Sequence, residues 1–333
     1  MKHFLWVDGE RVVRFGRGVA AEAVATLGGP GYRLLTTPRA EAAVPAVRAA
    51  AAATHYVERG AVPQLAAAAL AWARDAGGDD RIVALGGGRV IDVAKAVAAG
   101  LGAGTRALAV PTTLSGAELT TRHRHAAGVP DGTALVRCAV VVHDPALVAS
   151  QPLADLAASA CNALGHAVEA PCTVRANPVS TLAARDAAQR LVRAFAVPLD
   201  PDRDALALGA LLSGYALDFT GIGLHHVLSQ SLARFAGMWH GFANAAMLPH
   251  TTAALRLRAP EQLAALDEAA GVAMEALARR LAQHAGAQRL RDHGVTEEAL
   301  ETCVREALAR PQLANTPPAP EEDEIRALYE AAW

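Results

Sequence analysis

RIVALGGGRVIDVAK, residues 81–95, joins an apolar run to three consecutive glycines and then to a helical pattern. The run 81–85 predicts a strand and the segment 91–99 predicts a helix. Gly86 to Gly88, between them, leave backbone N–H groups accessible where the helix begins, so that a phosphate can approach without meeting a side chain. The stretch therefore predicts a strand, glycine turn and helix of the kind that binds a nucleotide in an α/β fold.

The other residues before position 150 continue this alternation of short apolar runs and helical patterns, as a parallel α/β sheet requires. Pro and Gly residues separate the runs. Strands are expected at 32–36, 55–57, 107–110 and 136–142, and helices at 40–53 and 65–75.

After Pro152 the pattern becomes helical almost throughout, in Ala- and Leu-rich segments. It breaks at Pro178, at 198–201 and around 237–241. We therefore predict an α/β domain over residues 1–150 and an all-helical domain over 151–333. Within the second domain, 311–320 predicts an irregular connector and 321–332 a short terminal helix.

The composition narrows the class of protein. At 333 residues the chain exceeds the size at which a single core usually stops growing, which also favours two domains. A net charge of -2 gives no reason to expect nucleic acid or an anionic membrane as a partner. No basic segment precedes an apolar stretch at the N-terminus, and no apolar run free of charges is long enough to span a bilayer. We expect a soluble cytoplasmic protein that acts on small molecules.

A second candidate cofactor element follows the strand expected at 107–110. The segment PTTLSG, residues 111–116, carries hydroxyl groups that can bond a diphosphate or a ribose. Asp92 and Lys95 follow the glycines at fixed offsets, which strengthens the signal from the glycines alone. The alternative is two ordinary turns between strands and helices.

Polar residues in the helical part indicate a second site. Asn162 and His166 are four residues apart in an Ala-rich run, as are His226 and Gln230, and residues four apart share one face of a helix. Two helices could therefore direct these groups, together with His240, toward one point. Any one of these histidines alone could equally be a core or helix-surface residue.

Several segments, in order, resemble one family. GGGRVIDVAK is similar to the GGGSxxDxAK signature of the iron-containing alcohol dehydrogenase family, within the dehydroquinate synthase-like fold. PTTLSGAELT, HDPALV, NALGHAVEA, HHVLSQSL and WHGFANAAMLPH match later elements of that family. Within it, the short form PTTxxGxE and the asparagine at position 162 most resemble the maleylacetate reductases.

The resemblance implies an N-terminal α/β nucleotide-binding domain and an all-helical C-terminal domain, with the active site in the cleft between them. It implies NADH or NADPH as the cofactor, and a homodimer as a plausible assembly. Lys95 could equally be a solvated helix lysine. The residues expected to line the cofactor are Gly86, Gly87, Gly88, Asp92, Lys95, Thr112, Thr113, Ser115 and Thr36.

The end of the strand at Thr36 and Thr37 bears on the choice of cofactor. Family members that select NAD often carry an aspartate there for the adenosine ribose. This chain has no acidic residue at that point, and Arg39 follows closely. Because a carboxylate would repel a 2′-phosphate, we expect NADPH to be accepted, beside NADH.

In metal-dependent relatives an aspartate and three histidines hold the cation, at positions that align with Asn162, His166, His226 and His240. Asn162 replaces the one charge that would offset a divalent cation, so no bound metal is expected. Zinc or iron on the three histidines is one alternative, and an inert relic of a metal site is another. Without a metal, these four residues would supply the hydrogen bonds and the proton that a carbonyl oxygen needs during reduction by hydride. Their individual roles stay open.

Two further sets of residues depart from the family pattern. Gln230 stands where relatives usually carry a histidine, and it can contact a substrate but cannot exchange a proton at neutral pH. Arg89 replaces a small serine, and could pair with a cofactor phosphate or crowd the pocket. The stretch 121–125 could bind an anionic substrate through its basic side chains, or could be a solvated loop. Those side chains are Arg122, His123, Arg124 and His125.

The sequence thus predicts an NAD(P)H-dependent reductase of a small, anionic carbonyl substrate, similar to the maleylacetate reductases and independent of metal. One alternative is a metal-dependent alcohol dehydrogenase. A second is a non-redox lyase or cyclase on the same scaffold, since a fold does not fix a function. A third is a nucleotide-binding homologue without activity.

Overall fold

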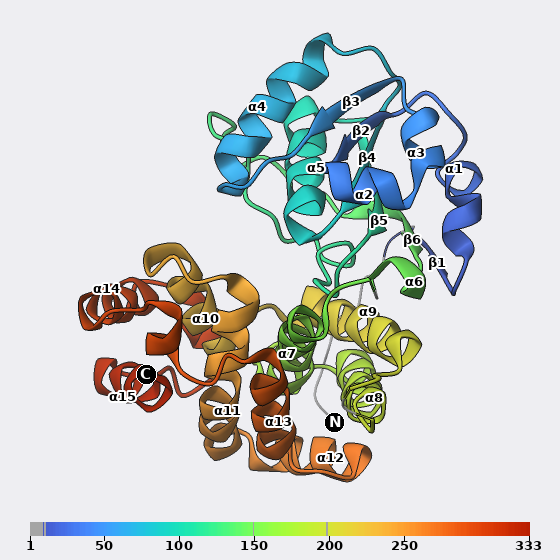
Figure 1. Cartoon of the computed structure of the whole chain (residues 1–333). Coiled ribbons are helices and arrows are strands. Elements are labelled where there is room, and N and C mark those ends of the chain that lie inside the picture. The colour runs from blue at the N-terminus through green and yellow to red at the C-terminus, as the bar shows by residue number, and fades with distance from the viewer. Residues whose placement is uncertain (1–8, 10, 149, 198) are drawn as a thin grey trace. The chain divides into compact units, whose positions relative to one another are not determined.

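The computed structural model describes residues 9, 11–148, 150–197 and 199–333. These residues form two compact units, which divide after Ser150 (Figure 1). The first unit contains a β-sheet with helices, and the second, from Gln151 to Trp333, is built from helices. The predicted combination of an α/β part with a parallel sheet and an all-helical part is therefore confirmed.

The sheet of the first unit has six strands among the described residues, and all of them pair in parallel. Strand β4 is buried along its whole length, as expected where helices cover both faces of a parallel sheet. The order across the sheet is β1-β6-β5-β4-β2-β3. The strands are β1 (Val12–Phe15), β2 (Arg33–Thr36), β3 (Ala53–Tyr56), β4 (Arg81–Gly86), β5 (Arg106–Pro111) and β6 (Cys138–His143).

Helices cover the two faces of this sheet (Figure 1). On one face, α1 to α3 pack over an apolar core that includes Leu34, Val83 and Leu108. Helices α4 and α5 lie together on the other face (Figure 1). The helical elements are η1 (Val19–Glu22), α1 (Ala23–Thr26), α2 (Pro38–Ala43), α3 (Pro45–Ala49), α4 (Val62–Asp75), α5 (Gly88–Leu101) and α6 (Pro145–Val148).

The single helix expected at 40–53 is wrong, because α2 and α3 are separate. Pro45 begins α3, and its ring disfavours a helical backbone at the residue before it. Val44 accordingly has φ -139° and ψ 72° and interrupts the helix. Strand β1 was not predicted, and β3 begins two residues earlier than the strand expected at 55–57.

The order of the strands places a topological switch point between β2 and β4. From β2 the chain proceeds to β3 on one side, and from β4 it proceeds to β5 and β6 on the other. Thr36, at the end of β2, pairs with Leu85, one residue before the end of β4. Ligands of open α/β sheets bind outside the carboxyl ends of the strands at such a point. The predicted glycine turn therefore lies at the edge of the sheet where a ligand is expected.

The second unit has no strand among its described residues. Helix α7 is its central helix: almost every residue from Leu156 to Glu169 is buried, and it packs against α8, α9, α11 and α13. The helical elements are α7 (Leu153–Glu169), η2 (Ala170–Cys172), α8 (Pro178–Ala194), α9 (Arg203–Thr220), α10 (Leu224–Phe235), α11 (His240–Arg258), α12 (Pro260–Ala270), α13 (Met274–Ala285), η3 (Leu290–His293), α14 (Glu297–Leu308), η4 (Pro311–Asn315) and α15 (Glu322–Ala332).

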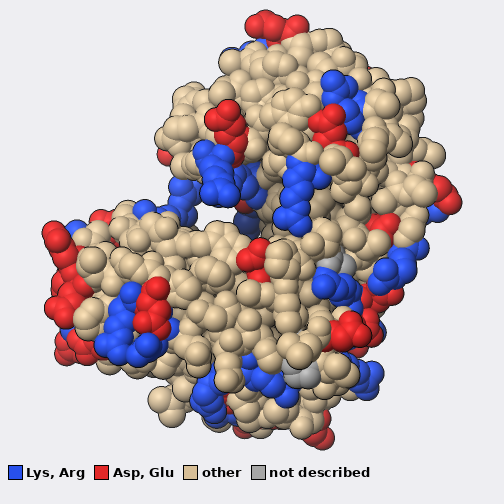
Figure 2. All heavy atoms as spheres, viewed as in Figure 1, with Lys and Arg blue, Asp and Glu red and all other residues tan. Residues whose placement is uncertain are grey.

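Two surface properties bear on possible partners. In the part of the chain that the structure describes, no single helix is long and apolar enough to cross a membrane, while the bent pair α9 and α10 meets that criterion only when taken together. On the face shown in Figure 2, Lys and Arg side chains are interspersed with Asp and Glu side chains over both units.

Candidate functional site

The glycine turn joins β4 to α5 and packs directly against the PTTLSG segment. Helix α5 begins at Gly88, and no side chain caps its first N–H groups. A Cβ atom on Gly87 would lie 3.1 Å from the Thr113 side chain, and one on Gly88 would lie 2.8 Å from Ser115 Cβ. Only glycine therefore allows this close approach. The structure brings together two predicted cofactor elements around a helix N-terminus, where the backbone favours an anion.

Thr36 and Thr112 lie at the same edge of the sheet but differ in their contacts. The Thr36 side chain is buried, and its hydroxyl donates to the Leu85 carbonyl over 2.9 Å. This hydroxyl ties β2 to β4, so any contact of Thr36 with a cofactor would be made by its backbone. The Thr112 backbone N–H donates to the Gly86 carbonyl over 3.0 Å, which fixes the start of the PTTLSG segment beside the turn.

Lys95 is fully buried, so the alternative of a solvated helix lysine is wrong. Its Nζ donates to the carbonyl oxygens of Ala117 at 2.8 Å, Thr120 at 3.1 Å and Arg122 at 2.7 Å. It also forms an ion pair with Asp92 Oδ1 at 2.9 Å. The ammonium therefore binds the chain that follows the PTTLSG segment to the side of α5, and the structure shows Lys95 and Asp92 as partners of each other.

The stretch 121–125 is more ordered than a solvated loop. His123 Nε2 accepts from the Val136 backbone N–H at 3.0 Å, and His123 Nδ1 lies 3.2 Å from the Arg124 carbonyl. Chiefly because of burial, the pKa of His123 falls to about 4, so this ring is neutral near pH 7. His123 thus stabilises the fold of the stretch. His123, Arg124 and His125 line a cavity of about 410 Å³ together with Asp131. Because the His123 ring is held by its contacts with the backbone, Arg124 and His125 are the candidates for binding a ligand there.

The four predicted residues of the helical part lie close together and make two sets of contacts. His166 lies on α7 and His226 on α10, and their rings stack with centroids 4.5 Å apart. Asn244 Nδ2, on α11, lies 3.3 Å from Asn162 Oδ1 and 3.1 Å from His240 Nε2. We call these residues, with Asn244, the histidine group. Gln230 lies one turn after His226 on α10 and is partly exposed.

Glu169 is a buried residue of this site that the sequence reading missed. Its Oε1 accepts from the His225 backbone N–H at 2.7 Å, and its Oε2 lies 2.8 Å from His226 Nδ1. The side chain, from α7, thereby caps the N-terminus of α10, which has no cap of its own. A helical signal was present, because Glu169 falls three residues after His166 and seven after Asn162, on the same face. Asn244, four residues after His240, could have been found in the same way.

Burial controls the charge of this site. It lowers the pKa of His225 and of His226 to about 3, so both rings are neutral at pH 7. Burial also lowers the pKa of His166, and neutral rings can stack without repulsion. For Glu169, burial raises the pKa, whereas backbone N–H groups of Gly223, His225 and His226 favour the carboxylate. We take Glu169 as the anion of the site, because it receives these donors at a helix N-terminus.

The donor atoms, as placed, do not fit a divalent metal ion. Among the residues that the structure describes, no group of three or more His, Cys, Asp or Glu side chains is arranged to hold one. Asn162 Oδ1 and His240 Nε2 both lie within hydrogen-bond distance of Asn244 Nδ2, whose two hydrogens they share with the His240 carbonyl. Those hydrogens would point toward a cation held by the same two atoms.

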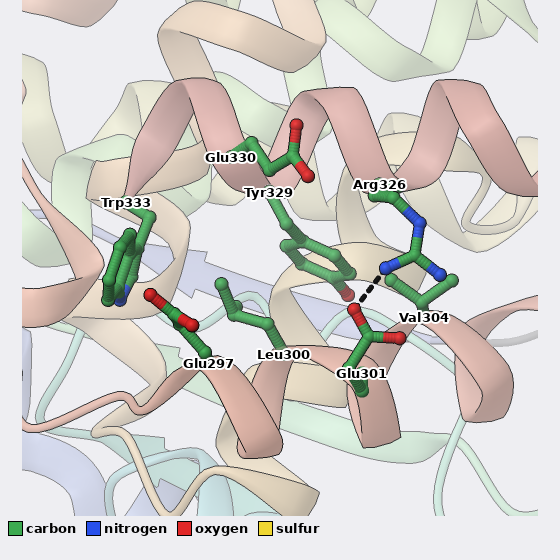
Figure 3. A pocket seen from close by; sticks show the side chains of 8 residues that line it. All are labelled: Glu297, Leu300, Glu301, Val304, Arg326, Tyr329, Glu330 and Trp333. Atoms are coloured by element: carbon green, nitrogen blue, oxygen red, sulfur yellow. Dashed lines mark hydrogen bonds and ion pairs between the residues drawn. The ribbon is translucent and has the colours of Figure 1, made fainter.

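A separate cavity of about 370 Å³ lies between α14 and α15 (Figure 3). Arg326 pairs with Glu301 across it, and Tyr329, whose hydroxyl donates to the Leu228 carbonyl at 3.0 Å, lies at its base. None of the predicted site residues lines it.

Comparison with known proteins gives consistent matches. Residues 156–333 match the model of the Fe-containing alcohol dehydrogenase family, C-terminal. The chain is 30% identical to a maleylacetate reductase from Rhizobium sp. (strain MTP-10005) over 278 residues, which are 78% of this chain and 75% of that protein. It is 33% identical to a 1,3-propanediol dehydrogenase from Klebsiella pneumoniae over 212 residues, 58% of this chain and 55% of that protein.

A solved structure agrees with these matches. The crystal structure of a maleylacetate reductase from Agrobacterium tumefaciens superposes with a TM-score of 0.84 at 28% identity. The superposition covers 100% of this chain and 99% of that one. The similarity therefore extends over both units.

Proposed function

The chain belongs to the iron-containing alcohol dehydrogenase family and is an NAD(P)-dependent oxidoreductase, and from this premise we propose that it reduces the carbonyl group of a small anionic substrate without a metal ion. The observation that carries the metal-free part is the Asn244 amide, which engages the oxygen of Asn162 and a ring nitrogen of His240. The relatives named maleylacetate reductase support the direction and the class of the reaction.

Two sets of residues would take separate roles in the reaction: one set binds the cofactor, and the other acts on the carbonyl oxygen of the substrate. When bound, the nicotinamide cofactor supplies the hydride. The N–H groups at the start of α5 are placed to hold a cofactor phosphate, and Thr113 and Ser115 add hydroxyls beside them. The histidine group would stabilise the negative charge that develops on the carbonyl oxygen and would direct a proton to it.

Cationic side chains in each of the two units support an anionic substrate. The positive charge of Arg310 contributes, after burial and His240, to the lowered pKa of His226, and it would attract an anion in the same way. Arg124 and His125 are a second candidate set, in the first unit. A carboxylate on the substrate is the group that such side chains bind best.

The reductase activity is tested by following the absorbance of NADH and of NADPH during incubation with keto acids, unsaturated keto diacids and simple aldehydes. We expect oxidation of both cofactors with at least one carboxylated ketone, and a lower KM for carboxylated substrates than for uncharged ones of similar size. No acidic side chain stands at the end of β2, at Thr36 or Thr37, to repel a 2′-phosphate, and Arg39 is exposed there, so NADPH should support turnover. If neither cofactor is consumed with any substrate, the proposed function is wrong. Negligible turnover with NADPH alone would refute only the cofactor prediction.

Metal independence is tested with the Asn162→Asp variant. Activity of the unmodified chain should persist after treatment with a chelator, and elemental analysis should find less than stoichiometric zinc or iron. Asn162→Asp restores the anionic donor that a divalent cation prefers, so this variant should retain zinc or iron through purification. Asn244→Ala is a useful companion, because it removes the competing amide without adding charge. Stoichiometric metal in the unmodified chain, lost together with activity on chelation, would contradict the proposal.

A further inference from the structure

Two rings of the histidine group, those of His226 and His240, differ in which nitrogen faces the site and in whether that nitrogen carries a proton. His226 Nδ1 faces a carboxylate oxygen of Glu169 at 2.8 Å, and a carboxylate can only accept. The proton of the neutral His226 ring therefore lies on Nδ1. Its Nε2 is left as a lone pair, buried and without a partner within the described part of the chain. His226 is thus an acceptor toward the site.

His240 has the opposite arrangement. Its Nε2 lies 3.1 Å from Asn244 Nδ2, and the orientation of that amide is set by a second contact, because Nδ2 also lies 2.9 Å from the His240 carbonyl, which can only accept. The two hydrogens of the Asn244 amide face three acceptors, which are the His240 carbonyl, His240 Nε2 and Asn162 Oδ1. An N–H group at Nε2 would face this NH₂ donor, so Nε2 carries no proton and the ring proton lies on Nδ1. His240 keeps contact with solvent, while packing around its ring lowers the pKa of His240 to about 4, so the ring is neutral near pH 7. The ring contact found among the described residues is that of Nε2, and Nδ1 has none there.

We infer that His240 is the catalytic donor to the carbonyl oxygen, and that Glu169 is a positioning residue that keeps His226 an acceptor. The inference rests on the proposed function, and it assigns roles to two of the three histidines whose roles the sequence left open. His225 is excluded as a donor, because its Nδ1 lies 2.8 Å from Thr251 Oγ1, whose own hydrogen is given to the Met247 carbonyl at 2.9 Å. The proton of His225 is therefore used within the fold.

The proton and electron balance follows from these positions. Hydride forms the new C–H bond at the carbonyl carbon, and the π electron pair of the C=O bond moves onto oxygen. The N–H group of His240 Nδ1 stabilises that oxygen and passes its proton to it. This transfer leaves the His240 ring as an imidazolate; water returns a proton to Nδ1 and leaves as hydroxide, since the residue is exposed to solvent. His226 accepts a hydrogen bond through Nε2, from a hydroxyl group of the substrate or from water, and does not protonate the product.

The proton positions can be measured without any substrate, by ¹⁵N NMR of the histidine rings in the chain treated with a chelator. Signals are assigned by comparison with His226→Gln and His240→Ala. We expect a protonated Nδ1 and an unprotonated Nε2 on both rings. In Glu169→Gln the amide oxygen must face the His225 backbone N–H, so its NH₂ group faces His226 Nδ1. The proton of His226 should then move to Nε2, while His240 stays unchanged. A protonated Nε2 on His226 in the unmodified chain, or no change in Glu169→Gln, would overturn the role of Glu169.

Kinetics test the role of His240. We expect His240→Ala to lower kcat by about 10²-fold to 10⁴-fold, the usual contribution of an acid–base group. His250→Ala, on the same helix and half-buried, is the matched control and should change kcat less than about twofold. Glu169→Gln should lower activity by about tenfold to a hundredfold while keeping its thermal unfolding cooperative. A kcat of His240→Ala within threefold of the unmodified chain would overturn the assignment. Absence of reductase activity in the unmodified chain would refute the proposed function instead, and the NMR result would still decide the proton positions.

Discussion

Replacing Lys95 with methionine is expected to destabilise the first unit by about 3–5 kcal/mol, the usual cost of removing one partner from a buried, hydrogen-bonded charge pair. Three backbone carbonyls, of Ala117, Thr120 and Arg122, would lose their common donor. Each buried acceptor left without a partner costs about 1–3 kcal/mol, and rearrangement of the segment would recover part of this. Methionine has a similar length and no charge, so it isolates the ammonium from the packing of the side chain. Urea unfolding followed by far-UV circular dichroism would measure the loss.

Lys95→Met should also weaken cofactor binding, although Lys95 itself is buried and bound to backbone. The carbonyls that it holds follow Thr113 and Ser115, which pack on the glycine turn. If the loosened segment occupied its bound conformation only about a tenth of the time, the apparent Kd for NADPH would rise about tenfold. Fluorescence titration with NADPH would measure it. Affinity equal to that of the unmodified chain would show that the segment keeps its place without the ammonium.

Two further variants distinguish the effect of removing a buried charge from the effect of removing any positive charge. Arg106 is a control in the same unit: its side chain is 53% exposed and lies 3.8 Å from Asp80, so Arg106→Met should cost less than about 1 kcal/mol. Lys95→Arg keeps the positive charge, but a planar, larger guanidinium cannot place three hydrogens on three carbonyls as an ammonium does. A large part of the loss should therefore remain. Full recovery in Lys95→Arg would mean that charge alone matters.

The sequence predicted the parts of the fold that depend on local pattern. The strand expected at 81–85 is β4, and the helix expected at 91–99 lies within α5, because an apolar run, three glycines and helical spacing are all read within a few residues. The prediction of one helix at 40–53 was wrong at a single position. Pro45 interrupts the helix there, although the apolar pattern on both sides is helical.

The role of Lys95 could not be read from local pattern, because its partners lie 22, 25 and 27 residues further along the chain. A signal was nevertheless present in the composition. Of the 31 Lys and Arg residues only two, Lys2 and Lys95, are lysines. A chain that uses arginine almost everywhere and keeps a lysine in its interior indicates a place that requires an ammonium. The same limit applies to Glu169, whose helical spacing shows the shared face but not the N-terminus of α10 that it caps.

Gly165→Ala is expected to lower reductase activity by about a hundredfold, because a misplacement of a catalytic group by about 1 Å can have an effect of that size. Gly165 lies on α7, opposite the start of α10. A Cβ atom there would lie 2.6 Å from His225 Nε2 and 3.3 Å from His226 Cε1. Neither ring can turn aside freely, since His225 is bound to Thr251 and His226 to Glu169. Both rings, or α10 itself, must move.

Two opposing effects determine the stability of Gly165→Ala: the higher helix propensity of alanine and the overpacking of a buried site. Alanine favours a helix over glycine by about 0.5–1 kcal/mol. Overpacking a buried site costs about 1–3 kcal/mol. The gain in helix propensity offsets part of this cost, so the free energy of unfolding should fall only slightly while the activity falls strongly. Gly209→Ala on α9 is the matched control, because Gly209 is also a buried helical glycine and the nearest atom to its Cβ would lie 3.2 Å away. That variant should keep its activity and unfold at nearly the same urea concentration as the unmodified chain. Full activity in Gly165→Ala would show that the reaction does not depend on where these two rings lie, and would remove the geometric basis for assigning His226 and Glu169 to it.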